Sequence, residues 1–311
     1  MSKVKKEQKP YKVPLLKDIR SNKELYSMLI PFFVLFFLMI LLPIVVAVVL
    51  SLTYYNMFEF PSFIGLRNYV NLFLNDDVFV IALRNTLLFS VITGPVSYLM
   101  CFGLAWLINE FKSGLRVLFT FCFYSPALAG ASVYFIWQFL FSGDTHGFIN
   151  SLLMNVGILQ EPIQWLTDTD YNFGVLIIVQ LWMSLGTGFL AFIAGFKGID
   201  KSLYEAGAID GIRNRIQELV YITLPQMKSQ LLFGAVMQIS ASFSVSTLSS
   251  QLFGATSTNY SAHTIVLHMM DYGTTRYEMG YACAVAVVLF MMMLVFKTLV
   301  NLALRYVGSD D

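Results

Sequence analysis

Residues 205–225 read EAGAIDGIRNRIQELVYITLP and lie between two long apolar segments. The stretch carries the signals of two short helices joined by a turn. Ser202 followed by Glu205 predicts a capping box at the first helix start, because each side chain can satisfy a backbone N–H there. Gly211 suits the left-handed position that ends a helix, and Asn214 suits the start of a second helix. A folded, partly apolar hairpin between membrane segments needs a covering surface, which indicates a protein partner.

The second helix of this hairpin is expected to present one continuous face, because its apolar and small residues recur three and four positions apart. These residues are Ile216, Leu219, Val220 and Thr223. Pro225 follows, and its missing N–H costs nothing in the first turn of the next helix. The expected order is therefore helix, turn, helix, and then a continuation that starts at a proline.

This hairpin resembles the cytoplasmic EAA loop of the permease subunits of ATP-binding-cassette (ABC) importers. The family pattern is Glu-Ala-Ala, a Gly four residues further on, and then Ile-x-Leu-Pro. The matching groups here are Glu205-Ala206-Gly207, Asp210-Gly211 and Ile222-Thr223-Leu224-Pro225. The third position is Gly207 instead of Ala, and the spacing from Gly211 to the Ile-x-Leu-Pro group is one residue longer than usual. The longer spacing leaves the register of the second helix open.

A second stretch, Phe63-Ile64-Gly65-Leu66-Arg67-Asn68-Tyr69, is similar to the F-x-G-L-x-N-Y segment of carbohydrate-importer permeases. That group contains maltose-type and glycerol-phosphate-type subunits. With the spacing of the apolar segments, the resemblance covers roughly residues 25–308. It implies the type I ABC importer permease fold, an all-α integral membrane fold in the bacterial cytoplasmic membrane. It also implies a subunit without catalytic activity or cofactor, with ATP hydrolysis on a partner chain.

The same resemblance implies the partners. We expect a related second permease subunit, a cytoplasmic ATPase, an extracellular solute-binding protein, a sugar substrate and membrane lipid, but no nucleic acid. In the family, the first helix of the loop docks in a groove of the ATPase. Carried over by position, the ATPase-coupling residues are Glu205, Ala206, Gly207, Asp210 and Gly211. Helix capping is the plainer role for Glu205 and Gly211, and one residue can serve both roles.

Composition independently indicates a membrane protein. The chain is 57% hydrophobic and only 13% charged, whereas a soluble domain carries about 25% charged residues. Six apolar stretches are long enough to span a bilayer, because ~20 helical residues cross its hydrocarbon core. The predicted spans lie near 28–52, 85–109, 117–141, 173–196, 229–250 and 281–304. We therefore expect a basic cytoplasmic tail over 1–27 and a transmembrane domain over 28–308, with a coupling loop over 197–228.

The placement of lysine and arginine predicts the orientation. The N-terminal tail holds eight of these residues, the second loop two, the fourth loop five and the C-terminal end two, so 17 of 20 fall on one side. The acidic residues split about evenly between the two sides. Both termini and the 205–225 hairpin are therefore expected in the cytoplasm, where an ATPase can reach the hairpin. The first stretch is expected to remain as a span, because it is too long for a signal peptide and no small-x-small site follows it.

The sequence shows no constellation for catalysis or metal binding. It contains no Gly-rich P-loop with Lys-Ser/Thr. His263 and His268 are five residues apart, not at the i, i+4 spacing of a helical zinc pair, so hydrogen bonding in a loop or contact with a partner is the favoured interpretation. The three cysteines fall inside predicted spans, where they are expected to be small packing residues. They are Cys101, Cys122 and Cys283.

Polar and aromatic side chains inside the spans mark a candidate translocation path, because lipid-facing positions avoid polar groups. Sugars are held by aromatic stacking and by hydrogen bonds to their hydroxyls. The candidate path residues are Gln180, Trp182, Ser184, Gln238, Ser242, Tyr124 and Trp137. Hydrogen bonding between helices is the alternative role for the polar members of this set.

Two other functions stay open. A permease of the same type for a non-sugar solute such as glycerol-phosphate would favour basic residues along its path, and the spans offer few. An ion-coupled carrier acting alone would need acids or bases near mid-membrane, and the interior of the predicted spans lacks Asp and Glu. The sequence therefore favours a sugar-importer permease driven by a separate ATPase.

Overall fold

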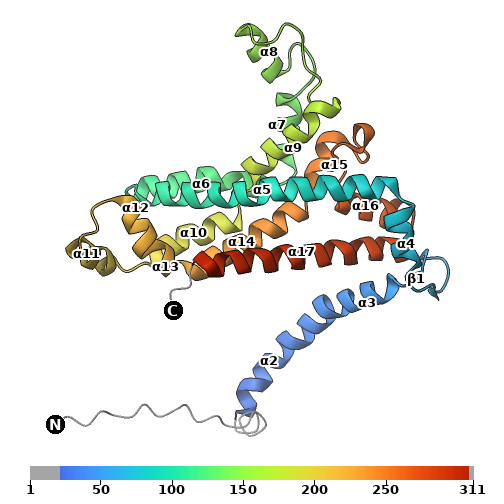
Figure 1. Cartoon of the computed structure of the whole chain (residues 1–311), viewed down its shortest axis with the longest axis horizontal. Helices are drawn as coiled ribbons and strands as arrows, with labels where there is room; N and C mark the ends of the chain where they lie inside the picture. Colours follow the sequence, from blue (N-terminus) through green and yellow to red (C-terminus); the bar gives the residue numbers. More distant parts are fainter. Residues whose placement is uncertain (1–21, 308–311) are drawn as a thin grey trace. The chain divides into compact units, whose positions relative to one another are not determined.

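The computed structural model describes residues 22–307, with side chains through residue 302. The chain divides into two compact units, Met1–Val49 and Leu50–Asp311. Helices dominate both units (Figure 1), and the described residues hold one small sheet, in which β1 (Thr53–Tyr54) pairs antiparallel with β2 (Ser62–Phe63). Residues 1–21 of the predicted basic tail lie outside the described residues.

The described part of the first unit is one long apolar helix. It comprises α2 (Lys23–Phe36), the π-helical turn η1 (Phe37–Leu41) and α3 (Leu42–Leu50). The π turn ends two residues before Pro43, whose ring nitrogen carries no hydrogen to donate, so the wider turn accommodates the missing backbone hydrogen bond. The segment is strongly apolar and none of its described residues is buried, as suits a helix whose sides face lipid or other membrane helices.

The second unit is a bundle of long helices with short connecting helices at its ends. Its elements, in order, are α4 (Arg67–Leu74), α5 (Asp77–Asn109), α6 (Ser113–Ala129), α7 (Ser132–Leu140), α8 (Phe148–Asn155), α9 (Thr169–Met183), α10 (Thr187–Gly198), α11 (Lys201–Ile209), α12 (Arg215–Glu218), η2 (Leu219–Thr223), α13 (Leu224–Gln226), α14 (Lys228–Phe243), α15 (Thr247–Phe253), η3 (Thr258–Tyr260), α16 (Ile265–Met270), η4 (Asp271–Thr275) and α17 (Met279–Val307). Helices α5, α10 and α14 pack against one another, and α17 packs against α14 and α16 (Figure 1).

Among the described residues, five helical segments are long and apolar enough to cross a membrane. The predicted third span, 117–141, is not straight: α6 and α7 meet at a bend of 97° next to Gly130, whose φ is +58°. The count reaches six only if this bent pair is one span. The helix that contains the predicted second span, 85–109, begins earlier, at Asp77. The Asp76 carboxylate caps it there by accepting the Phe79 N–H at 2.9 Å.

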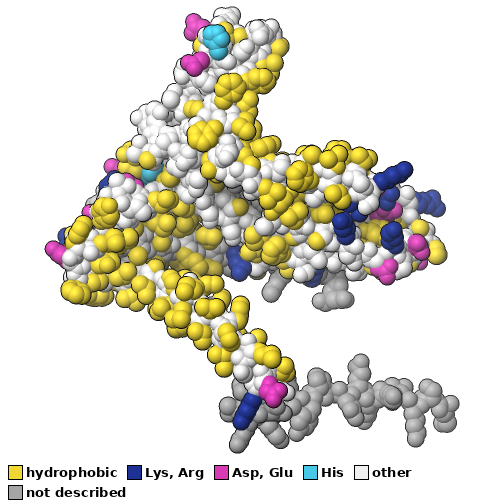
Figure 2. All heavy atoms as spheres, turned by 180° about the vertical axis from the view of Figure 1, so that it is seen from behind, with side chains coloured by type: hydrophobic (Ala, Val, Ile, Leu, Met, Phe, Trp, Pro, Cys, Tyr) yellow, Lys and Arg dark blue, Asp and Glu magenta, His cyan; other side chains and the backbone are white. Residues whose placement is uncertain are grey.

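Buried side chains form three apolar clusters that hold the second unit together. The cluster around Phe189 and Phe192 joins α5 to α10, and the cluster around Phe79 and Phe243 joins α5 to α14 and α17. The rest of the surface remains strongly apolar. Figure 2 shows hydrophobic side chains along the flanks of the helices, and Lys, Arg, Asp and Glu gathered at the ends of the bundle, which is the pattern of a protein whose sides lie in a membrane.

Candidate functional site

The hairpin between α10 and α14 begins two residues earlier than predicted. The carboxylate of Asp200 accepts the N–H of Ser202 at 3.0 Å and so caps α11. The predicted capping box of Ser202 with Glu205 is therefore wrong, because Asp200 satisfies the helix start before Ser202 can. Glu205 instead lies exposed in the middle of α11, where its carboxylate faces solvent.

The turn after α11 forms as predicted. Gly211 has a φ of +97°, and the N–H of Ile212 donates to the carbonyl of Gly207 at 2.9 Å. This is a Schellman end, in which the residue after the left-handed glycine bonds back across the last helical turn. Gly207 itself is buried, and a Cβ there would press on the side-chain tips of Ile222 and Ile212. An Ala at this position, as in the family pattern, would require these two side-chain tips to shift.

The second half of the hairpin contains a π turn that the sequence pattern did not reveal. Asn214 caps α12 by accepting the N–H of Gln217 at 2.7 Å, as predicted. The helix then widens into η2 over Leu219–Thr223. A π turn holds one more residue than an α turn, so η2 accommodates the longer spacing before Pro225. The change in register divides the predicted single face: Ile222 and Thr223 are buried, whereas Ile216 and Val220 are exposed.

The hairpin presents a mixed apolar and charged surface. Ile209 is 87% exposed, and the other exposed large apolar residues are Leu203, Ile216, Val220 and Tyr221. The predicted coupling residues Glu205, Ala206, Asp210 and Gly211 are also exposed, and only Gly207 is buried. Apolar side chains of this size at a polar loop are typical of a surface that meets a protein partner.

One ion pair ties the hairpin to the bundle, and two further contacts lie within the hairpin itself. Arg215 forms ion pairs with Glu110 at the end of α5 (3.2 Å) and with Glu218 (2.7 Å), and the hydroxyl groups of Tyr204 and Thr223 lie 3.0 Å apart. Between them is a cavity of about 300 Å³. A hairpin joined to the helix ends over a cavity can transmit a push on its outer surface to α5 and α10.

The predicted path residues fall into two groups. Gln238 is 4% exposed and joins three segments: it accepts from the Ser97 hydroxyl at 3.1 Å and donates to the Ser184 carbonyl at 3.1 Å and the Cys101 sulfur at 3.1 Å. The hydroxyls of Ser184 and Ser242 donate to carbonyls of their own helices. In this conformation these three residues bond between or within helices, and their path role stays a prediction.

The aromatic members form the second group. The rings of Trp137 on α7 and Trp182 on α9 meet edge to face at 5.2 Å, and Trp182 is 41% exposed. Gln180 is half-buried on α9, two residues before Trp182 and so on a different face of the helix. Tyr124 packs in the separate cluster around Phe192. The structure thus brings the two tryptophans together but leaves Tyr124 apart from them.

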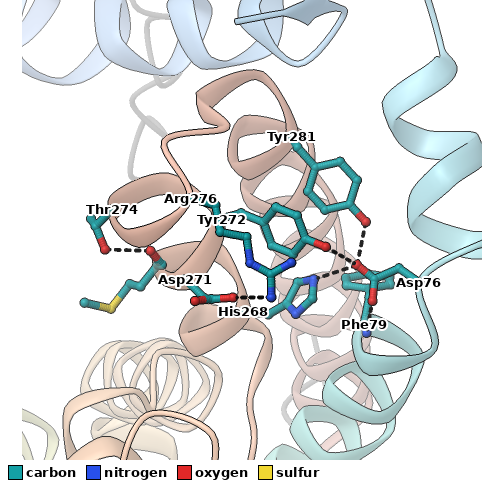
Figure 3. Close-up of polar contacts among 9 residues, drawn as sticks. Asp76, Phe79, His268, Asp271, Tyr272, Thr274, Arg276 and Tyr281 are labelled. Carbon is teal, nitrogen blue, oxygen red and sulfur yellow. Dashed lines mark hydrogen bonds and ion pairs between the residues drawn. The ribbon is translucent and has the colours of Figure 1, made fainter. Parts of the chain in front are cut away.

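Sequence reasoning missed a polar cluster at the opposite end of the bundle from the hairpin (Figures 1 and 3). Asp76, only 11% exposed, accepts hydrogen bonds from Tyr281 (2.7 Å), Tyr272 (3.1 Å) and His268 (3.1 Å) at one carboxylate oxygen. The other oxygen holds the N–H of Phe79. This Asp76 cluster joins the start of α5 to α16, η4 and α17. Its partners lie about 190 to 205 residues away in sequence, so no local motif signals it.

Burial and hydrogen bonding fix the charges in the Asp76 cluster. Burial by itself raises the pKa of the Asp76 carboxyl, but the hydrogen bonds from Phe79 and Tyr281 and the nearby His268 bring that pKa below its ordinary value. Burial lowers the pKa of His268 despite the adjacent carboxylate. At neutral pH, His268 is therefore neutral and its Nε2–H donates to a charged Asp76. Burial and then His268 lower the pKa of His263 to about 4.

Comparison with known proteins places the chain in a family. The model of the binding-protein-dependent transport system inner membrane component matches residues 102–309. A probable ABC transporter permease, YesP of Bacillus subtilis (strain 168), is 30% identical over 88% of this chain and 89% of its own. The arabinooligosaccharides transport system permease AraP of the same strain is 29% identical over 80% of this chain and 77% of its own. The lactose transport system permease LacF of Rhizobium radiobacter is 34% identical over 56% and 57%.

The solved structures agree in fold. A crystal structure of a bacterial ABC transporter involved in the import of the acidic polysaccharide alginate matches with a TM-score of 0.75 at 24% identity, over 94% of this chain and 98% of that one. This chain belongs to the family of binding-protein-dependent transport system inner membrane components. It is a multi-pass protein of the cytoplasmic membrane, as the sequence predicted, and its family is that of non-catalytic transporter subunits.

Proposed function

We propose that this chain is a permease subunit of a sugar or oligosaccharide importer, coupled through its hairpin to a separate ATPase. The relatives named above act on lactose and arabino-oligosaccharides, which supports the substrate class. In this proposal α6 and α7 form one bent span, the protein crosses the membrane six times, and both termini are cytoplasmic. A second permease subunit and an extracellular solute-binding protein complete the assembly. One neighbouring structure contains an alginate pentasaccharide-bound periplasmic protein, which supports the latter.

The observation that carries the coupling proposal is the exposed tip of the hairpin. Ile209 projects almost fully from the end of α11, directly before the Schellman turn at Gly211. The turn fixes the direction of α11, and the small residues Ala206 and Ala208 on its exposed surface let a partner approach closely. Charged residues of both signs, including Lys201, Arg213 and Asp210, surround this tip and can set the orientation of a partner.

The path proposal rests on the tryptophan pair. Trp182 presents an exposed ring braced by Trp137, and such an aromatic face offers the stacking contact that a sugar ring requires. Half-buried Gln180 lies on another face of α9. Gln238 and Ser184 are placed deeper, between α5, α9 and α14. They would contact a sugar when the helices separate, by exchanging interhelical hydrogen bonds for bonds to hydroxyls. No group in this path needs to titrate, so the driving force comes from ATP on the partner.

Co-purification tests the coupling proposal. The tagged chain, expressed with its native operon partners and extracted in mild detergent, is expected to retain an ATPase and a sibling permease. Ile209→Asp places a charge at the centre of the docking surface, and we expect at least about tenfold less ATPase with the sibling permease unchanged.

The matched control is Ile158→Asp, at a 66% exposed position after α8 and far from the hairpin in the chain. It is expected to retain the ATPase at the parental level. Equal retention by Ile209→Asp and the parent would contradict the docking role of α11, and recovery of no ATPase from any form would leave the lone carrier as the better function.

A further inference from the structure

A cavity of about 920 Å³ lies beside the Asp76 cluster. Its walls come from β1, β2, the polar side of α4, and the starts of α5 and α17. Its principal lining side chains are Tyr54, Arg67, Asn71, Asn75, Asp77 and Glu278, with Asp76, Tyr272 and Tyr281 of the Asp76 cluster at one wall. Figure 3 shows the two tyrosines and Asp76 converging at this point. No role described above uses this cavity.

The cavity has a fixed shape. Asn68, which is buried, donates both amide hydrogens, to the carbonyls of Ser51 and Thr53 at 2.9 Å each, and so holds α4 against the segment that contains β1. The N–H of Gly280 donates to the carbonyl of Tyr55 at 3.0 Å, which holds the start of α17 against the same loop. These bonds, with those to Asp76, make a preformed site that needs no folding of its walls on binding.

The helix ends fix the depth of the cavity in the membrane. Two apolar helices begin at its edge, α5 at Asp77 and α17 at Met279, and the loop that lines it follows the first apolar helix, which ends at Leu50. Ends of membrane-spanning helices lie at the level of the lipid headgroups. The cavity therefore opens where headgroups are the most abundant solutes.

The charges of the cavity suit a zwitterion. Within residues 22–302, no ion pair engages the guanidinium of Arg67 or the carboxylates of Asp77 and Glu278. Arg276 is different, because it is paired with Asp271 at 2.7 Å and stacked on the Tyr272 ring at 4.2 Å. One available cation and two available anions around one cavity match a phosphate joined to an ammonium group.

An apolar surface continues from the rim of the cavity. Helix α4 lines the cavity with Arg67 and Asn71 and turns Val70 and Phe73 outward, since these residues lie on its other side. The exposed large apolar residues of α4 and the preceding loop are Met57, Phe58, Phe60, Phe63, Leu66, Val70, Phe73 and Leu74. Phe60 is 98% exposed and Phe63 is 78% exposed. An in-plane amphipathic helix with aromatic neighbours is a membrane-surface element.

We propose that this cavity binds the headgroup of a zwitterionic phospholipid, with its phosphate on Arg67 and its ammonium group on Asp77 and Glu278. The acyl chains then lie along the apolar side of α4 and the loop. A soluble sugar would also find amides and hydroxyls here, but it would leave three charges unpaired and would not use the adjoining apolar surface. A bound lipid would hold the Asp76 end of the bundle at a set depth.

Native mass spectrometry of the delipidated, detergent-purified complex tests this site. The probes are dioctanoyl phosphatidylethanolamine, dioctanoyl phosphatidylglycerol, which lacks the ammonium group, and maltotriose. The parent is expected to bind the ethanolamine lipid in preference to the glycerol lipid. Arg67→Gln is expected to weaken binding of both lipids by roughly tenfold, because it removes a charge-assisted bond to phosphate. Asp77→Asn with Glu278→Gln is expected to abolish the preference between the two lipids.

The matched control is Arg84→Gln, which removes an exposed cation from α5 about two turns from Asp77 without touching the cavity. It is expected to change lipid binding by less than about twofold. Equal losses in Arg67→Gln and Arg84→Gln, or binding of maltotriose in place of lipid, would overturn the proposal. The three altered residues of the cavity, Arg67, Asp77 and Glu278, are exposed. If Arg67→Gln fails to assemble, Glu278→Gln alone serves as the test. The assay uses no ATP, so its outcome is independent of the coupling proposal.

Discussion

The two ends of the bundle hold similar types of residue in opposite environments, exposed at the hairpin and enclosed around Asp76. At the hairpin end, Glu205, Asp210 and Arg213 face solvent and Ile209 has nothing to cover it. At the other end, Asp76 is enclosed by a histidine and two tyrosines that satisfy its charged oxygens. In our proposal the hairpin end engages the ATPase and is therefore left uncovered in the subunit, whereas the Asp76 end joins helices of the same chain and is satisfied internally.

This difference separates two kinds of polar residue in a membrane protein. Polar groups that are already fully hydrogen-bonded contribute to the position and stability of the helices. Polar and apolar groups that are exposed together at a capped helix tip mark contact with another molecule. Substitutions at the Asp76 end should therefore lower the melting temperature, whereas substitutions at the hairpin should reduce coupling to the ATPase.

The largest effect is expected from Asp76→Leu. The change removes the common acceptor of Tyr281, Tyr272 and His268 and leaves their donors unpaired at a partly buried site, which costs about 3–5 kcal/mol in comparable cases. The melting temperature of the complex in detergent should fall sharply, while complex that still assembles retains its ATPase. Glu59→Gln, at an exposed acid of the same end that does not line the cavity, serves as the control and should leave the melting temperature close to that of the parent. An unchanged melting temperature in Asp76→Leu would show that the cluster does not hold the helices.

Acid should weaken the same end. The folded pKa of His263 is about 4, below its unfolded value, so stability is complete above pH 6.5 and is lost as pH falls from 6.5 towards 4, where the unfolded chain takes up the proton first. At pH 5 the loss is about 2 kcal/mol. The Asp76 contribution is fully present above the ordinary carboxyl pKa of 3.8 and is lost as the pH falls from there through the lowered pKa of the folded protein. The melting temperature should be lower at pH 5 than at pH 7.5, and His263→Gln should reduce this difference. An equal difference in the parent and the variant would contradict the assignment of the acid effect to His263.

Between the two ends, the tryptophan pair should affect transport alone. Trp182→Ala removes the exposed stacking face, and we expect about tenfold slower sugar uptake in proteoliposomes, since one aromatic stack contributes about 1–3 kcal/mol in related contacts with planar ligands. Phe139→Ala, at a similarly exposed aromatic of α7, is the control and should transport at the parental rate. Equal slowing by both changes would point to a general loss of packing on α7 and α9.

The smallest effect is expected from Gly211→Ala. A left-handed φ costs a residue with a Cβ about 1–2 kcal/mol, so α11 should point in its docking direction less often. ATP hydrolysis stimulated by loaded binding protein should fall severalfold, with the melting temperature nearly unchanged. Gly157→Ala carries the same kind of strain, at a φ of +79°, in the loop after α8, and it should hydrolyse ATP normally. Similar losses in the two variants would mean that strain anywhere in the chain slows the transporter.

The hairpin was largely predictable from sequence because its signals are local. Asn214 and Gly211 act within a few residues of their positions, and both predictions are confirmed. The Ser202 cap failed because the helix already begins at Lys201, with Asp200 as its cap, so Ser202 lies inside the first turn. The sequence announced the π turn at η2 only as a spacing one residue longer than the family pattern. Whether the extra residue forms a bulge, a loop or a longer helix depends on the burial of Ile222 and Thr223.

The other end was unpredictable for a physical reason. Asp76 reads as a helix cap beside an acidic neighbour, and its partners are close to it only after α16 and α17 fold back along α5. The 97° bend between α6 and α7 was missed for a related reason: hydropathy reports that a segment is apolar but does not report its direction. The path residue Gln238 shows the same limit, because its neighbours Ser97 and Ser184 come from two other helices.

The most direct test of the coupling proposal is a site-specific cross-link from the hairpin. Ala208→Cys, in a Cys122→Ala background and labelled with a short photoreactive group, should form a cross-link to the ATPase chain in the membrane. Ile158→Cys, labelled in the same way, should not. The absence of any cross-link from position 208 to an ATPase, in membranes where the complex imports sugar, would contradict the role of the hairpin.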